Sequence, residues 1–300
     1  MPAFFLHVTA MELVAKRPGL PERFRAAFER EPGAMRLGSI FVDLPYLENF
    51  PLQLARHYTG AVTFAQPWGQ IFHTRATGSL GLALIEALRR EHGLGREGSD
   101  RAIAFIGGFL SHHAFDRTIH PLVRAHVERD LATRGGHPNR WHQHCEKWQS
   151  LFFHRDHAGR DCMGTRHFDE RARTFPGARL LSPSLPDDLF ETIESASLTV
   201  HARAPGRRQI GSWLRWARVY ARLTATPLGR REGIAKDGSP IEQRVYYDEP
   251  DFPAHFERAI TATLDALAAA ADALETSDID AAARAAFLHR VPNVDISVGF

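Results

Sequence analysis

Apolar residues recur along most of the chain at the three- and four-residue spacing of an α-helix, whereas the alternating pattern of a β-strand is scarce. Pro121 is expected to kink the chain, or to restart the helix, between two of the predicted elements. The predicted helices cover residues 4–16, 22–30, 77–92, 101–119, 122–133, 139–153, 187–202, 206–224 and 251–275. With no internal repeat, low-complexity run or linker, the sequence predicts an all-α fold in which residues 1–300 form a single helical domain.

The composition is that of an ordinary globular protein, with 44% hydrophobic residues and 37 Lys and Arg against 35 Asp and Glu. This charge balance gives no reason to expect a stable nucleic-acid partner. Two cysteines exclude a disulfide framework as the basis of the fold. No stretch approaches the roughly 20 apolar residues of a transmembrane segment, and the first residues lack the pattern of a signal peptide. We therefore expect a cytoplasmic protein without a transmembrane segment, whose oligomeric state the sequence leaves open.

Histidine changes this picture, because several of the 17 histidines stand at the spacing of metal ligands. In SHHAFDRTIHP, His112 and Asp116 are four residues apart and project from one helix face, with His120 one further step along. Imidazole and carboxylate both bind Zn²⁺. The neighbours, such as Phe109 and Leu110, are apolar, so these polar groups face the interior or a cleft. Burial there is costly without a partner, which is either a metal or a His–Asp hydrogen bond at a helix crossing.

A second pair with the same spacing lies on the next predicted helix, in NRWHQHCEKW. His142 and Glu146 share one face, and a helical bundle would bring them within reach of the first motif. Alone, this spacing is common on solvated helix faces. His144 and His113 are out of phase with the carboxylates and are the less suitable ligands.

Three further residues are candidates from their surroundings. Asp43, in GSIFVDLPY, lies between apolar residues and a Leu-Pro turn, and is either a buried ligand or a turn-forming residue. His73, in GQIFHTRATG, precedes a helix and is either a ligand or a loop residue. His7 lies on an apolar helix, where a histidine is usually part of the core.

Taken in order, these elements resemble one family, the bacterial zinc-dependent phospholipase C proteins, whose wider relatives include the P1/S1-type nucleases. The most specific stretch is GGFLSHHAFDRTIHP, and the resemblance spans most of the chain. It implies a helical bundle of the zinc-dependent phospholipase C and P1 nuclease type, with two or three Zn²⁺ ions in a cleft. By resemblance, one zinc is held by Asp43, His73, His112 and Asp116, a second by His120, His142 and Glu146, and a third by His7 with Asp116 bridging.

The chain departs from the family pattern at the third site. Secreted members use the amino group and carbonyl of a processed N-terminal tryptophan as ligands, whereas this sequence begins Met1-Pro2, with His7 close behind. The third metal is therefore expected to be differently ligated, weak or absent.

The resemblance implies a zinc-dependent, phospholipase C-like hydrolase of phosphoesters that uses a metal-activated water. Asp43 would orient the water and act as general base. The implied partner is a phosphoester substrate such as a phospholipid headgroup. Aromatic residues near the candidate site, which would suit a quaternary ammonium or would simply be core, are Tyr46, Phe64, Trp68 and Phe72. Two alternatives stay open: a nuclease or phosphatase on the same zinc cluster, and a non-catalytic helical protein that binds zinc.

Overall fold

The computed structural model describes residues 4–52, 55, 67–91, 93, 99–158, 185–224, 244–248, 251–276 and 278–297. Every regular element in these ranges is a helix, which confirms the predicted all-α fold. The α-helices are α1 (Phe4–Val14), α2 (Glu22–Arg30), α3 (Pro32–Phe41), α5 (Pro67–Thr74), α6 (Thr77–Glu91), α7 (Ser99–Arg134), α8 (Pro138–Ala158), α10 (Asp187–His201), α11 (Arg207–Thr224), α14 (Asp251–Glu275) and α15 (Ala281–Arg290). Two short 3₁₀ helices are η1 (Leu44–Leu47) and η2 (Arg244–Tyr246).

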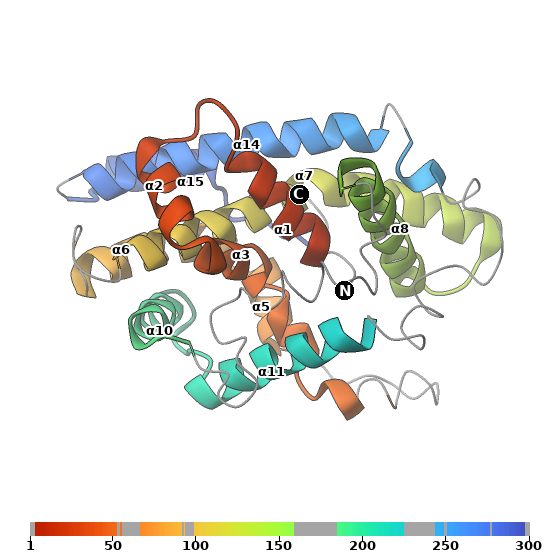
Figure 1. Cartoon of the computed structure of the whole chain (residues 1–300), viewed down its shortest axis with the longest axis horizontal. Helices are drawn as coiled ribbons and strands as arrows, with labels where there is room; N and C mark the ends of the chain where they lie inside the picture. Colours follow the sequence, from red (N-terminus) through yellow and green to blue (C-terminus); the bar gives the residue numbers. More distant parts are fainter. Residues whose placement is uncertain are drawn as a thin grey trace.

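The 36-residue helix α7 is the centre of the bundle. Figure 1 shows α14 running beside it, and α2, α3, α6 and α8 also contact it. Its first half is buried on all sides, because apolar residues such as Ile103 and Phe109 occupy more than one face. A helix with this pattern must lie inside the protein, since each face needs an apolar neighbour.

The expected restart of the helix at Pro121 is wrong, because α7 is continuous through this residue. Proline removes one backbone hydrogen bond, but it does not end a helix that is packed on both sides of it. Before Pro121, the ring of Phe115 packs against Phe256 of α14, and after it His126 packs against Tyr246. These contacts fix the direction of both halves, so the three residues His112, Asp116 and His120 stay on one helix face.

The backbones of α3 and α7 touch where the two helices cross, and glycine is what allows it. A Cβ atom on Gly108 would lie 2.1 Å from the carbonyl oxygen of Met35, and one on Gly38 would lie 2.0 Å from that of Phe105. Only a residue without a side chain fits at such an approach. The close crossing brings the end of α3, and the residues that follow it, against the polar face of α7.

Three of the described α-helices, α3, α5 and α15, were not predicted from the pattern, and neither were the 3₁₀ helices η1 and η2. The segment that follows α15, residues 291–297, packs onto the body of the protein with Val291 and Ile296 buried. Within the described part of the chain, no helix combines the length and apolar character needed to cross a bilayer. That residues 1–300 form one domain stays a prediction.

Candidate metal centre

The carboxylate of Asp116 lies at the centre of a ring of histidines. Its Oδ2 is 3.0 Å from Nε2 of His112 and 3.7 Å from Nε2 of His73. Its Oδ1 is 3.2 Å from Nε2 of His7 and 4.0 Å from Nε2 of His120. Asp116 is 4% exposed, so one buried carboxylate serves four imidazoles from three helices. A buried carboxylate needs partners of this kind to remain charged.

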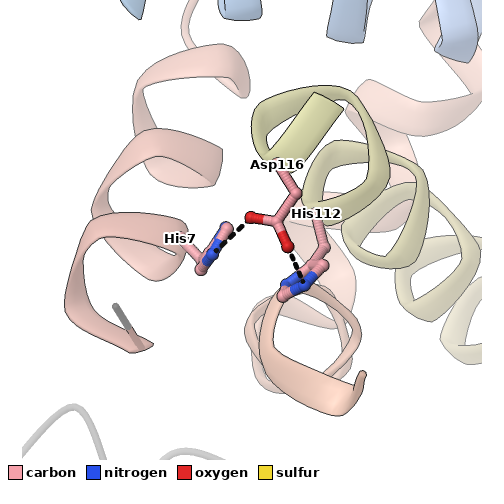
Figure 2. A group of neighbouring side chains, drawn as sticks. All are labelled: His7, His112 and Asp116. Carbon is pink, nitrogen blue, oxygen red and sulfur yellow. Dashed lines mark ion pairs between the residues drawn. The ribbon is translucent and has the colours of Figure 1, made fainter. Parts of the chain in front are cut away.

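Figure 2 shows how α1 and α7 meet at this carboxylate, with one oxygen directed at His7 and the other at His112. The rings of these two histidines are stacked, with their centroids 4.1 Å apart. Both are buried, at 4% and 0% exposure. Since His7 is otherwise surrounded by apolar residues on α1, this contact gives it a polar partner inside the core.

Asp43 and His73 enter the centre from two short elements. Helix α3 ends at Phe41, and Asp43 precedes η1 without capping it, because its side chain makes no cap hydrogen bond. Its Oδ1 lies instead 3.2 Å from Nε2 of His73. His73 lies in the last turn of α5 rather than in a loop.

Helix α8 closes the other side of the centre with His142 and Glu146. Oε1 of Glu146 is 3.0 Å from Nε2 of His142 and 3.2 Å from Nε2 of His120. The four-residue spacing on α8 directs both side chains at the same turn of α7. The His142–Glu146 spacing is common on exposed helices and is not specific by itself, but the fold places these two residues next to the α7 motif.

All eight residues expected to bind metal lie in three neighbouring groups. Within each group the potential ligand atoms lie no more than 4.8 Å apart. The groups are His7, His112 and Asp116; Asp43, His73 and His112; and His120, His142 and Glu146. The last group matches the ligands of the second zinc implied by the resemblance. The other two groups contain the remaining five residues, and His112 belongs to both of them.

Three of the histidines are oriented by backbone carbonyls. The acceptors are Gly69 for His73, at 2.6 Å, Ser39 for His112, at 2.9 Å, and Ile296 for His120. A carbonyl can only accept, so Nδ1 of each ring must carry a proton, and Nε2, which faces the carboxylates, is the nitrogen that would bind a metal once the ring is neutral. This is the arrangement that metal-binding histidines adopt, with one nitrogen on the ion and the other held by a fixed acceptor.

The charges of the centre are strongly coupled. Burial opposes ionisation of Asp116, but His112 and His120 outweigh it and hold the pKa of this carboxyl well below its usual range. Glu146 behaves in the same way beside His142 and His120, and its pKa is also lowered. Burial likewise opposes protonation of His112 and His120, yet the carboxylates, Asp116 foremost, raise the pKa of His112 to about 9 and that of His120 to about 10. The carboxylates are therefore ionised and strongly attract positive charge.

Two buried nitrogen atoms indicate that a metal cation supplies the positive charge which the carboxylates attract. Within the described residues, Nδ1 of His7 and Nε2 of His112 have no hydrogen-bond partner. Nε2 of His112 lies 3.0 Å from Oδ2 of Asp116, with which it forms an ion pair when the ring is protonated, whereas Nδ1 of His7 has no such neighbour among the hydrogen bonds of the described residues. Such atoms are costly to bury. A set of imidazole nitrogens and carboxylate oxygens without thiolate suits zinc in a catalytic rather than a closed structural site.

The remaining candidates lie elsewhere or serve the core. Nε2 of His113 contacts the carbonyl of Pro292, at 3.0 Å, and His144 accepts from Trp148, at 3.1 Å. Trp68 and Phe72 are buried against each other, while Phe64 lies outside the described residues. Tyr46 reaches the centre, with its hydroxyl 3.4 Å from Nδ1 of His73.

Sequence reasoning missed the backbone carbonyls of Gly69, Ser39 and Ile296, because a carbonyl has no signature in the sequence. It also assigned Tyr46 only to a possible aromatic site. The DLPY turn was the available signal for Tyr46, since the 3₁₀ helix that follows Asp43 brings the phenol back to His73.

The comparisons with known proteins agree with this geometry. The sequence model of a family described as zinc dependent phospholipase C matches residues 6–182, which is more than half of the chain and includes all eight candidate ligands. No curated protein and no solved structure matches the chain significantly.

Proposed function

Because the chain belongs to the zinc-dependent phospholipase C family, whose members hydrolyse phosphoesters, we propose that it cleaves the phosphodiester of a phospholipid at the centre on α7. The observation that carries the proposal is the buried Asp116 carboxylate, within 4.0 Å of four imidazole nitrogens. The residues proposed to hold two or three zinc ions are His7, Asp43, His73, His112, Asp116, His120, His142 and Glu146.

When bound, zinc supplies Lewis-acid activation of a water molecule and neutralises charge on the phosphoryl group. Asp43 is proposed to accept the proton of that water. Burial opposes its ionisation, but His112 and His73 outweigh burial and lower the pKa of Asp43, so the carboxylate is ionised and able to act as a base. The water oxygen would form a bond to phosphorus while the bond from phosphorus to the glycerol oxygen breaks, and the proton taken up by Asp43 would pass to that oxygen, which leaves as the hydroxyl of diacylglycerol.

Tyr46 is proposed to donate a hydrogen bond to a phosphoryl oxygen. Burial, followed by the carboxylates of Asp43 and Asp116, raises the pKa of its phenol, so the hydroxyl keeps its proton. Its oxygen lies 3.4 Å from Nδ1 of His73, a nitrogen that already donates to Gly69.

Membership of the family supports a phospholipid as the class of substrate, and we further propose which headgroup it carries. We expect a choline phospholipid, because Tyr46 offers an aromatic face beside the carboxylates. The competing functions would all use the same zinc centre, so assays with different substrates separate them. A nuclease would cleave single-stranded nucleic acid, a phosphatase would cleave nitrophenyl phosphate, and a non-catalytic zinc protein would cleave neither.

The experiment assays all three substrates with the zinc-loaded protein and with Asp43→Asn. We expect release of phosphocholine from phosphatidylcholine by the unchanged protein, and loss of at least about two orders of magnitude in kcat for the variant, which is the usual contribution of a general base. Zinc-loaded protein that hydrolyses only nucleic acid or nitrophenyl phosphate would replace the proposed substrate. Zinc-loaded protein that hydrolyses none of the three would overturn the proposed activity.

A further inference from the structure

The segment after α15, residues 291–297, touches the metal centre through the backbone of one residue. The amide of Ile296 donates to the carbonyl of His73, at 2.8 Å, and the carbonyl of Ile296 accepts from Nδ1 of His120. One residue thus links the end of α5 to the middle of α7. Ile296 is 1% exposed, so water does not compete for either bond.

The same segment is anchored to the start of α6 by side chains that are not candidate ligands. The hydroxyl of Thr77 donates to the carbonyl of Val294, at 2.8 Å, and accepts from its amide, at 3.2 Å. The side-chain oxygen of Asn293 accepts from the amide of Ser79, at 2.7 Å, and its nitrogen donates to the Ser79 hydroxyl, at 2.8 Å.

The fit at this anchor is close. A Cβ atom on Gly78 would lie 1.9 Å from the carbonyl oxygen of Val291, so the two backbones are in direct contact. Nε2 of His113 adds a contact to the carbonyl of Pro292, at 3.0 Å. A segment held at four successive residues, 291 to 294, can place the carbonyl of the next buried residue with little freedom.

We propose that residues 291–297 are a positioning element of the metal centre, in which Ile296 fixes the tautomer and ring orientation of His120, and Thr77 and Asn293 hold Ile296 in place. The segment lies outside the residues that match the family, 6–182. The proposal rests on the proposed ligand set, because His120 must bind zinc for its orientation to matter. Acceptors that hold ligand histidines typically contribute 10- to 100-fold to metal affinity, which is the effect expected here.

The test uses substitutions at the anchor, away from the ligands. Thr77→Val removes both hydrogen bonds to Val294 while keeping the size of the side chain, and Thr77→Ser restores the hydroxyl. Thr263→Val is the matched control, because Thr263 is also a fully buried threonine, and its hydroxyl bonds, among the described residues, to Ala259 of its own helix α14. Asn293→Ala, at an exposed position, weakens the same anchor if Thr77→Val fails to fold.

Zinc affinity is measured by chelator competition, with the absorption spectrum of the Co²⁺-loaded protein as a report on ligand geometry. We expect Thr77→Val to weaken the affinity of one zinc by about 10- to 100-fold and to change the Co²⁺ spectrum, whereas Thr77→Ser and Thr263→Val keep both unchanged. Asn293→Ala should follow Thr77→Val with a smaller effect.

Three results would overturn the proposal. If Thr77→Val and Asn293→Ala keep the unchanged zinc affinity and spectrum, the segment only closes the core, and the proposed function stands. If Thr263→Val weakens zinc as much as Thr77→Val does, the effect is one of general stability. If the unchanged protein binds no zinc, the proposed function and this inference fail together.

Discussion

Asp116→Asn is the substitution with the most defined consequence. It keeps the shape of the side chain and removes one negative charge from the middle of four histidines. Asparagine also places an amide group where one of the carboxylate oxygens stood, and an amide nitrogen cannot bind a cation. The centre then has fewer negative charges and fewer ligand atoms for the same number of imidazoles.

The magnitude follows from burial. Asp116 is 4% exposed, so solvent does not screen its interaction with a cation. Removing one partner of a buried ion pair typically costs about 3–5 kcal/mol. At about 1.4 kcal/mol for each factor of ten, zinc affinity should fall by roughly two to four orders of magnitude, and hydrolysis should fall with it.

The assay compares zinc content and affinity in Asp116→Asn and in Asp130→Asn. Asp130 is a matched control because it is also buried on α7, at 3% exposure, and its partners are not candidate ligands: they are the hydroxyl of Tyr246, at 2.7 Å, and the guanidinium groups of Arg129 and Arg134. It stands 14 residues further along, about 21 Å at the rise of an α-helix. We expect Asp130→Asn to lower the free energy of unfolding and leave zinc affinity unchanged. A folded Asp116→Asn protein with normal zinc affinity would refute the reasoning.

Three further predictions concern protons, packing and metal. The raised pKa values keep His112 and His120 protonated at pH 7 in the metal-free protein, so zinc binding should release about two protons. Zinc affinity should rise with pH through about pH 9, where His112 loses its proton, and level off only above about pH 10, where His120 loses its own. Calorimetry in buffers of different ionisation enthalpy measures the proton release, and zinc uptake without it would contradict the prediction. Gly108→Ala should lower the free energy of unfolding in denaturant by about 1–3 kcal/mol, because the new Cβ would meet the backbone of α3. The control Gly206→Ala, whose Cβ would have nothing within 4 Å, should change this free energy by no more than about 0.5 kcal/mol. Equal effects of the two substitutions would be inconsistent with the close α3–α7 crossing. Chelation should lower the melting temperature, with recovery on addition of Zn²⁺ but not Mg²⁺, because imidazole ligands favour zinc; recovery with Mg²⁺ alone would indicate an oxygen-ligand site.

The sequence was most informative where the pattern was long or the chemistry was local. The spacing of His112, Asp116 and His120 needs only helical geometry to place the three on one face. The candidate set from His7 to Glu146 also came from residue types and order, and the structure brings these residues together. How the ions divide among them depends on distances between helices, which spacing along the chain does not contain.

The missed elements have physical explanations. Helix α3 is buried at seven of its ten positions, so it shows no contrast between an apolar and a polar face. Helix α5 has only eight residues, which is too short for a clear period. At Pro121 the local preference for a break is overridden by packing on α14 and near η2. The contact of Ile296 with His120 is made by a backbone carbonyl 176 residues away in the sequence, and no residue type signals it.

Anomalous X-ray scattering from crystals of the protein, recorded above and below the zinc absorption edge, tests the central claim most directly. The account predicts two or three peaks between α1, α5, α7 and α8, each at about 2.0–2.2 Å from imidazole nitrogens and carboxylate oxygens. One peak should lie against His120, His142 and Glu146, and another should lie against Asp116. Crystals grown with zinc that show no peak at these residues, or show peaks only at surface histidines, would contradict it.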